Sequence, residues 1–400
     1  MSVLFSLLMI VVGVVIVLVL ITLHELGHFL FAKWSKAYVF EFSIGFGPRL
    51  FTIKTKETWY SVRILPLGGF VSIASDFSPP PNGREEEFAT IPDERKIDYA
   101  VKWKKALFIL AGPIVNLFIA FILIMSVFLS NGYKPNDMNS NGQIFAKDSV
   151  ALKIIQELEP NLESDAQNIV LTGIQIKWNE DLKKEKDFTS TKYSIMVQEV
   201  SDYLSETNKL IKTEPDFFSS ISLAFSYQQI DKYTQKVNGE IKDTGLKEVD
   251  QDILENWKNQ KVMRIGIQPP HKYFKNNWSA FGYSFVETWN QAISLIKGLG
   301  SFFTGHFNAI SGPLGMFNTS GATTSVKTNY ALYIAGISAN LFMLNMLPFP
   351  PLDGFKFWEA LIEWITKKEM NTKLKTIVYI VGAIFLLGLM IIVTIKDIII

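Results

Sequence analysis

The chain has 400 residues, of which 48% are hydrophobic, and its formal net charge at pH 7 is +1. The hydrophobic content and the positive mean hydropathy are typical of an integral membrane protein with a soluble portion, and the near-neutral charge argues against a nucleic-acid partner. The absence of cysteine excludes disulfides, thiolate metal sites and cysteine nucleophiles, and with only four histidines a zinc site needs carboxylate ligands as well.

The first apolar segment carries the sequence His-Glu-Leu-Gly-His from His24 to His28. Histidines four residues apart share one helix face and reach the same zinc ion, and Glu25 is placed to take a proton from zinc-activated water. Chance copies of this motif are ordinary surface residues, but at membrane depth each ionisable group costs roughly 2.5–3.5 kcal/mol, which a bound metal offsets. Because the segment has no basic start and no cleavage site, we expect a retained transmembrane helix over residues 4–31.

Residues 38–73 follow this span and have the pattern of strands. Two runs rich in β-branched and aromatic residues are separated by glycine-containing turns, which predicts a small β-hairpin or sheet next to the membrane. Residues 75–105 are typical of a solvated loop, and a second apolar span is expected over 106–129.

Residues 130–270 are mixed and mildly acidic, and we expect one compact α+β domain there. Within it, Asn238-Gly239 between two short strand-like runs predicts a hairpin turn. Residues 271–327 are expected to form a connector and an amphipathic helix. The aromatic side chains and isolated charges of 278–304 favour a helix at the membrane interface over a fifth span.

The last part of the chain, 328–400, contains two further apolar stretches, 329–347 and 376–395, so that four transmembrane helices are expected. Lysine and arginine gather in the connections after the first span and between the third and fourth. By the positive-inside rule these connections are cytoplasmic, and both termini and the domain 130–270 are extracytoplasmic. The sequence therefore predicts a polytopic α-helical membrane protein whose first membrane half is 1–129.

A third zinc ligand has to come from elsewhere in the chain, because a catalytic zinc usually has three protein ligands and one open position. The extended histidine motif fails, since Phe31 and Trp34 stand where it needs glycine and histidine. Asp353 follows a proline-broken run on the same side of the membrane as His24 and His28, and irregular backbone is tolerated at that depth where it lines a cavity. On spacing alone, an ordinary Asp-Gly turn at a helix end explains Asp353 equally well.

These motifs together resemble the site-2 protease family of intramembrane zinc metalloproteases, and within it the bacterial branch with four spans and an outer PDZ domain. The resemblance covers almost the whole chain in family order, and its paired zinc motifs are specific, whereas the glycine motifs alone are weak. The matching stretches are His24-Glu25-x-x-His28, Asn345-x-x-Pro348-x-x-x-Leu352-Asp353-Gly354, Gly45-Phe46-Gly47-Pro48, Leu67-Gly68-Gly69-Phe70, Ala111-Gly112-Pro113-Ile114-Val115-Asn116 and Ser311-Gly312-Pro313-Leu314-Gly315.

The resemblance implies a zinc metalloendopeptidase that hydrolyses peptide bonds of single-span membrane proteins within or near the bilayer, in regulated intramembrane proteolysis. Carried over residue by residue, His24, His28 and Asp353 bind Zn²⁺ and Glu25 is the general base and then the general acid. Asn345 holds the substrate or stabilises the oxyanion.

The resemblance also implies how the substrate is held. The hairpin around Gly45, Phe46 and Gly47 borders the site, and an edge strand there binds the substrate in the extended form that exposes its carbonyls. Implied substrates are anti-sigma factors, signal-peptide remnants or pheromone precursors.

Leu171–Asn179 resembles a PDZ stretch in which Ile174 replaces the usual Asp, and no carboxylate-binding glycine loop precedes it. A degenerate PDZ-like domain that filters or docks substrates is therefore expected.

Two other functions use the same residues. A zinc or cation transporter would use the histidines and Asp353 as a transit site, but further polar residues along the spans are sparse. A catalytically silent membrane scaffold has no need of Glu25.

We expect Asn116 and Asn340 to make interhelical hydrogen bonds rather than to act in chemistry. Gly112 and Gly336 are expected to permit close helix packing, and His271 and His306 to be surface histidines.

Overall fold

The structure is a computed structural model, and its described part is divided by contacts into two units, Met1–Val127 with Gly282–Ile400 and Phe128–Phe281. His306 and the motif from Ser311 to Gly315 lie outside the described residues. The described residues are 3–76, 78, 80–134, 144–145, 149–160, 169–178, 185–189, 199–200, 202–204, 220–231, 233–234, 236–260, 265–268, 271–303, 326–367 and 370–399.

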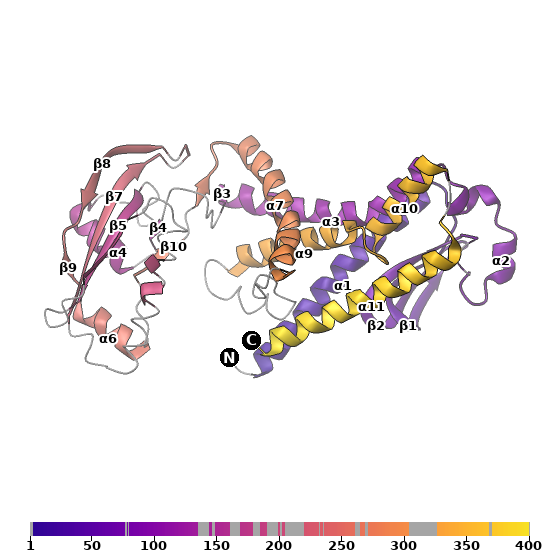
Figure 1. Ribbon diagram of the computed structural model, residues 1–400, viewed down its shortest axis with the longest axis horizontal. Coiled ribbons are helices and arrows are strands. Elements are labelled where there is room, and N and C mark those ends of the chain that lie inside the picture. Colours follow the sequence, from indigo (N-terminus) through magenta and orange to yellow (C-terminus); the bar gives the residue numbers. More distant parts are fainter. Residues whose placement is uncertain are drawn as a thin grey trace. The chain divides into compact units, whose positions relative to one another are not determined.

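Each of the four predicted spans falls on a long helix (Figure 1). These helices are α1 (Val3–Trp34), α3 (Lys102–Asn131), α9 (Val326–Met346) and α11 (Thr372–Ile399). Within them, Val11–Trp34 and Trp103–Asn131 are long and apolar enough to cross a membrane, and Tyr330–Met346 is a shorter apolar helix. The described residues thus contain two candidate membrane helices, and membrane crossing by α9 and α11 stays a prediction.

Helix α7 (Asn277–Phe303) covers the segment predicted to be an interfacial helix. Its small polar and aliphatic side chains are buried, as at Ser284 and Ala292, which are 0% exposed. Its bulky side chains point outward, with Phe285 65% and Trp289 47% exposed. This arrangement is the inverse of a helix on a soluble protein and suits lipid or interfacial contact.

The predicted β-hairpin is formed by β1 (Val39–Lys54) and β2 (Trp59–Ile73), which pair antiparallel. Residues 41–44 have partners both in 59–62 and in 69–72, so the long hairpin bends back on itself into a compact sheet. The bend requires glycine at two positions, since Gly45 and Gly47 have φ of +86° and +85°, and a side chain at Gly45 would lie 2.7 Å from the Leu65 carbonyl oxygen.

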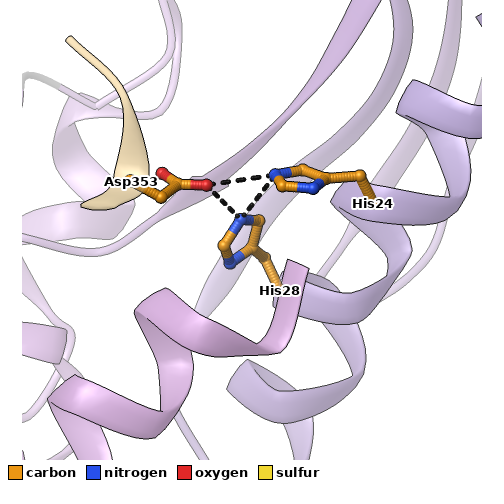
Figure 2. A group of neighbouring side chains, drawn as sticks. All are labelled: His24, His28 and Asp353. Carbon is orange, nitrogen blue, oxygen red and sulfur yellow. Dashed lines mark hydrogen bonds and ion pairs between the residues drawn. The ribbon is translucent and has the colours of Figure 1, made fainter. Parts of the chain in front are cut away.

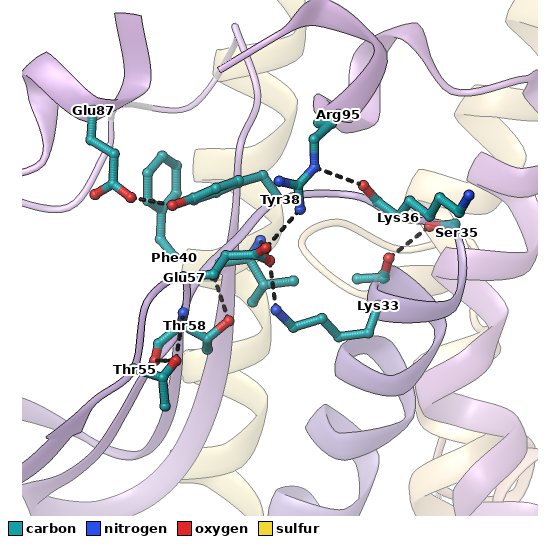
Figure 3. A network of polar contacts seen from close by, with 12 residues as sticks. Lys33, Ser35, Lys36, Tyr38, Phe40, Thr55, Glu57, Thr58, Glu87 and Arg95 are labelled. Atoms are coloured by element: carbon teal, nitrogen blue, oxygen red, sulfur yellow. Dashed lines mark hydrogen bonds and ion pairs between the residues drawn. The ribbon is translucent and has the colours of Figure 1, made fainter. Parts of the chain in front are cut away.

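A polar network fastens this sheet to the end of α1 (Figure 3). Lys33, in the last turn of α1, lies 2.6 Å from one oxygen of Glu57, and Arg95 lies 2.7 Å from the other. Burial raises the pKa of Glu57, but hydrogen bonds from Arg95 and Lys33 outweigh that effect and hold the pKa below its usual value. The ionised Glu57 therefore joins three segments distant in sequence and fixes where the sheet lies along α1.

The segment 75–105 is more ordered than the predicted solvated loop. It contains α2 (Glu85–Ala89) and two short 3-10 helices, η1 (Asp93–Arg95) and η2 (Ile97–Tyr99). Its anchor is Arg84, which is 3% exposed and donates to the carbonyl oxygens of Phe40 and Glu57 at 2.7 and 2.8 Å. Composition alone does not reveal this order, because it does not show that one arginine of the loop caps the sheet.

The second unit has a five-stranded antiparallel sheet in the order β6–β5–β7–β8, with β9 also paired to β7. Helices and sheet share one core, as in the predicted α+β domain, with Ile155, Ile176 and Phe225 all 0% exposed. The elements are α4 (Val150–Leu158), β5 (Ile169–Trp178), β6 (Glu185–Thr189), β7 (Ile221–Ile230), β8 (Val237–Asp243), β9 (Lys247–Glu248), α6 (Gln251–Gln260), and the short pairs β3 (Tyr133–Lys134) with β11 (Lys272–Tyr273) and β4 (Ile144–Phe145) with β10 (Ile267–Gln268).

The hairpin turn predicted at Asn238-Gly239 lies elsewhere. Both residues are inside β8, where Gly239 has φ +91° next to an irregularity in the pairing with β7. The turn itself precedes β8, because Ile230 already pairs with Val237. It is closed by Asp231, whose carboxylate accepts from the Thr234 amide at 2.7 Å. The side-chain hydrogen bonds of Asp231 fix the turn, and the glycine serves a bulge.

Glu41 is the buried charge at the centre of the hairpin, and it generates a test of the fold. It is 1% exposed and pairs with Arg49 at 2.6 Å and Arg63 at 2.7 Å. Burial raises its pKa, but hydrogen bonds from Arg49, Ser61 and Arg63 prevail and place the pKa below the ordinary 4.5. A lowered folded-state pKa means that its stabilisation is present above pH 4.5 and is lost as the pH falls below that value.

We expect Glu41→Gln to lower the free energy of unfolding by about 2 kcal/mol at neutral pH, because two arginines lose their counter-charge. The stability of the variant should also depend less on pH below 4.5. Thermal unfolding of detergent-purified protein at several pH values measures both effects, with the exposed Glu86→Gln as control. Equal unfolding temperatures for both variants would contradict the role of Glu41.

Candidate active site

The site is built on one turn of α1, where His24 and His28 point the same way because they are four residues apart in a helix. Both are almost fully buried, at 6% and 7% exposure. His28 uses its Nδ1 to donate to the carbonyl oxygen of Phe108 on α3, at 2.8 Å. That bond leaves the Nε2 lone pair of His28 facing into the site, which is the state a metal ligand needs.

The structure brings Asp353 to these two histidines from 329 residues further along the chain (Figure 2). Its Oδ2 lies 3.0 Å from His24 Nε2 and 3.1 Å from His28 Nε2, and the two nitrogens are 3.2 Å apart. All three predicted ligands therefore converge on one point, and among the described residues they form a group that could hold a metal ion.

The donor set and the spacing fit a zinc ion. Two imidazole nitrogens and one carboxylate oxygen are a usual set for catalytic zinc, and such a site keeps its fourth position open. Three atoms each roughly 2.0–2.1 Å from one tetrahedral zinc are separated from one another by about 3.3 Å. The observed separations of 3.0, 3.1 and 3.2 Å come close to that value.

The space at the centre of the site depends on Gly112 of α3. A Cβ atom there would lie 2.3 Å from His28 Nε2 and 2.7 Å from His24 Nε2, closer than a side chain can approach either nitrogen. We predicted that Gly112 and Gly336 permit close helix packing. Gly336 would meet Gln291 at an ordinary 3.6 Å, whereas a side chain at Gly112 would collide with the two predicted histidine ligands.

Asp353 is placed by the loop between α9 and α10 (Asp353–Thr366). A side chain at Gly354 would lie 2.4 Å from the carbonyl oxygens of Met346 and Leu347, so α10 starts directly against the end of α9. On the other side, Gly382 of α11 leaves room for the Pro350 carbonyl. These two close approaches fix the loop, and Asp353 projects from it towards α1.

The two carboxylate oxygens of Asp353 have different partners. Lys356, one turn further along α10, lies 3.0 Å from Oδ1, while Oδ2 faces the histidines. The carboxylate thus directs only its Oδ2 towards the histidines, at 3.0 Å from His24 Nε2 and 3.1 Å from His28 Nε2.

Glu25 follows His24 on α1 and is half-buried beside the sheet. A Cβ atom at Gly69 of β2 would lie 3.4 Å from Glu25 Cγ and 2.7 Å from the Ser43 carbonyl oxygen. The strand passes close to Glu25 only because residue 69 has no side chain. The motif Leu67-Gly68-Gly69 is present in the sequence, but its place beside Glu25 follows from the sheet and could not be read from the motif.

The other predicted site residues lie less close to the three ligands. Asn345 is in the last turn of α9, and in the described part of the chain no hydrogen bond joins it to His24, His28 or Asp353. The turn of Gly45, Phe46 and Gly47 packs on the strand from Arg63 to Leu65, and Phe46 touches the position of Gly68. Its glycines have a sufficient backbone explanation, and a substrate contact there stays a prediction.

His271 is not the surface histidine that we predicted. It lies in the second unit, half-buried, with its ring stacked on Tyr133 at a centroid distance of 4.2 Å. Burial lowers its pKa to about 4, so it is neutral at physiological pH. Stacking on an aromatic neighbour, which spacing does not reveal, gives it a packing role.

Comparison with known proteins places these features in one family. The family model of peptidase family M50 matches residues 12–389. A protein of Clostridium acetobutylicum named as a zinc metalloprotease is 30% identical over 393 residues, which cover 98% of this chain and 97% of that protein. One from Clostridium perfringens, also named as a zinc metalloprotease, is 28% identical over 385 residues, 95% of each chain. The protease Eep of Enterococcus faecalis is 25% identical over 456 residues, covering 95% of this chain and 96% of that one.

Gly112 lies against the two histidines and Gly336 does not, so we expect their alanine variants to differ in zinc binding. Gly112→Ala should abolish zinc binding, because the new methyl group would occupy the space between His24 and His28. Gly336→Ala adds the same methyl group at an ordinary contact distance and should bind one zinc per chain. Metal analysis of both purified proteins decides the matter, and full zinc occupancy of Gly112→Ala would contradict the placement of the metal.

Proposed function

The chain belongs to peptidase family M50, the site-2 protease family, and on that premise we propose that it cleaves single-span membrane proteins within or near the bilayer. Membership makes it a membrane zinc metalloprotease, and the named relatives agree. The proposal goes further in three respects: the residues that act, the substrate class, and the use of the enzyme in regulated intramembrane proteolysis.

One observation carries the assignment of residues. His24, His28 and Asp353 come from two ends of the chain and meet with ligand atoms 3.0–3.2 Å apart, beside Glu25. Two imidazoles and a carboxylate buried among apolar helices are costly to bury, and a cation that accepts their lone pairs would offset that cost. We therefore assign these three residues as the zinc ligands.

Zinc, when bound, supplies Lewis-acid activation of water and of the scissile carbonyl. Glu25 then has two tasks. Its carboxylate accepts a proton from the attacking water, and as a carboxylic acid it returns that proton to the nitrogen of the leaving amine. The half-buried position of Glu25 beside Gly69 suits both tasks, because the carboxylate is held by the helix but open towards the strand. Asn345 is proposed to hold the substrate or to donate to the oxyanion.

The substrate is proposed to bind as an extended strand. A helical transmembrane segment hides its carbonyls in its own hydrogen bonds, so it has to unwind before attack. Residues 41–44 are paired on both sides, whereas 69–72 pair only with β1 among the described residues. Gly69 of this strand lies close to Glu25, so addition of a substrate strand to the free edge of 69–72 is proposed to bring a substrate carbonyl towards the ligands. The turn at Gly45, Phe46 and Gly47 would border this path.

The proposed arrangement in the cell follows from charge and helix order. The chain lies in the cell membrane with four spans, the site faces the cytoplasmic side, and the termini and the unit Phe128–Phe281 are extracytoplasmic. The domain at 130–270 is proposed to be PDZ-like and to limit which substrates reach the membrane, with the helix α7 of the connector 271–327 at the interface. Anti-sigma factors and signal-peptide remnants are the implied substrates.

Three substitutions test the roles of the ligands and of Glu25. Asp353→Ala and His24→Ala should lose zinc and cleavage together. Glu25→Gln keeps the size of the side chain and should retain zinc while the rate falls by about 10²–10⁴-fold, as for loss of a general acid-base group. Zinc analysis beside cleavage of a single-span reporter gives both quantities. Near-normal cleavage by zinc-loaded Glu25→Gln would refute the proposed role of Glu25. Metal transport into vesicles without cleavage would instead favour a transporter.

Cysteine labelling tests the orientation, because the natural chain has no cysteine. Cysteines replacing Thr90 or Lys373 should be protected from an impermeant thiol reagent in intact cells, whereas one replacing Glu240 should react. All three positions are exposed in the structure, so burial does not explain a difference. After cell lysis the first two should react as well. Labelling of Thr90→Cys in intact cells would reverse the proposed orientation.

A further inference from the structure

One face of α3 lies against the two histidines of the proposed metal site. It presents three residues spaced four apart, Phe108, Gly112 and Asn116. Phe108 uses its carbonyl oxygen to accept from His28, and Gly112 leaves the central volume open. Asn116 stands at the third position of this face. It is 1% exposed, and its amide lies against His24, with Nδ2 3.3 Å from His24 Nδ1.

The other atom of this amide, Oδ1, is buried without a hydrogen-bond partner within the described residues. The oxygen and nitrogen of a side-chain amide have nearly the same shape, so a half-turn about the last bond exchanges them. In either orientation one atom of the amide faces His24, so the half-turn exchanges a donor for an acceptor at that ring. The state of His24 therefore decides which atom of Asn116 turns towards it.

His24 can present its Nε2 lone pair to a metal only if the ring proton is on Nδ1. A protonated Nδ1 is a donor and needs an acceptor, which Asn116 supplies when Oδ1 faces it. With Nδ2 facing His24, two donors would oppose each other at 3.3 Å. With its oxygen turned towards His24, Asn116 thus stabilises the tautomer of His24 that binds metal.

We propose that Asn116 is a positioning residue that fixes the tautomer and ring orientation of His24 by accepting from its Nδ1, and so raises the affinity of the site for zinc. The proposal rests on the proposed function, since it takes His24 as a zinc ligand. It also revises the expectation that Asn116 serves only to join helices. Asn116 does join α3 to α1, but the group it joins is the ring of a metal ligand.

The two histidines differ in a way that makes the proposal testable. The acceptor for His28 is the backbone carbonyl of Phe108, which no side-chain substitution removes. The acceptor for His24 is a side chain, so substitution at Asn116 alters one ligand and leaves the other unchanged. Loss of such an outer partner typically weakens metal binding by about 10–100-fold.

Two variants of Asn116 separate positioning from packing, because the two roles rank them in opposite order. Asn116→Leu keeps the volume of the side chain but has no acceptor, whereas Asn116→Asp keeps an acceptor and introduces a charge. If Asn116 only packs, Leu should be tolerated and Asp should be harmful. If Asn116 positions His24, the Leu variant should lose zinc affinity and the Asp variant should retain it, since a carboxylate is a common partner of metal-bound histidine.

The measurement is the zinc dissociation constant of the full-length protein in detergent, by competition with a chromophoric chelator, together with the absorption spectrum of the cobalt(II)-loaded protein. We expect Asn116→Leu to weaken zinc binding by about 10–100-fold and to shift the cobalt bands, and Asn116→Asp to bind at least as tightly as the natural protein. Ser338→Ala is the matched control. It removes the neighbouring buried bond from Ser338 to the Asn116 carbonyl oxygen, 2.7 Å long, without touching His24, and should leave zinc affinity unchanged.

Natural zinc affinity in Asn116→Leu, or equal losses in the Leu and Asp variants, would overturn the positioning role. His24→Ala makes the failure of the two proposals distinguishable. If His24→Ala binds zinc like the natural protein, the assignment of ligands is wrong. If His24→Ala loses zinc while Asn116→Leu does not, the ligands stand and only the role of Asn116 is refuted.

Discussion

The constraint on which the rest of this structure depends is the burial of three ionisable side chains around one point. His24, His28 and Asp353 have side-chain exposures of 7%, 8% and 13%, and their lone-pair-bearing atoms face one another. Burying one such ionisable group at membrane depth costs roughly 2.5–3.5 kcal/mol, even by the lower of the available estimates. A divalent cation between them would neutralise the carboxylate and accept all three lone pairs, so the cluster is suited to a metal site.

Much of the surrounding structure serves to hold this cluster together. Helix α1 supplies the two histidines, the loop before α10 supplies the carboxylate, and α3 leaves the space between them at Gly112. Close contacts at Gly354 and Gly382 fix the loop, and the network around Glu57 fixes the sheet on the other side of α1. The glycines matter here for the volume that they leave open, since a single methyl group at any of them would collide with backbone or ligand atoms.

The sequence predicts those parts of the site that depend on local periodicity. His24 and His28 are found from their spacing, because four residues make about one helical turn whatever the rest of the fold does. Asp353 is not fixed by spacing, since 325 residues separate it from His28, and only the family motif identified it. The roles of Gly112 and Asn116 could not be predicted, because they depend on which face of α3 meets α1. The turn near Gly239 was misplaced for a related reason: side-chain bonds of Asp231 closed the chain earlier than the glycine signal indicated.

The same geometry bears on how a substrate would reach the proposed metal site. Access from α3 is closed, because Gly112 and Asn116 pack against the two histidines. Access past Asp353 is narrowed by the loop that α11 contacts at Gly382. The side of Glu25 differs, since β2 passes there with only a glycine, and this segment of strand has one unpaired edge among the described residues. A substrate that adds to this edge gains backbone hydrogen bonds as it loses its helical ones, so unwinding and positioning become one step. Proteolysis in an apolar environment would then depend on the sheet as much as on the metal. The sheet would provide the backbone hydrogen bonds that an extended substrate needs where no water is present.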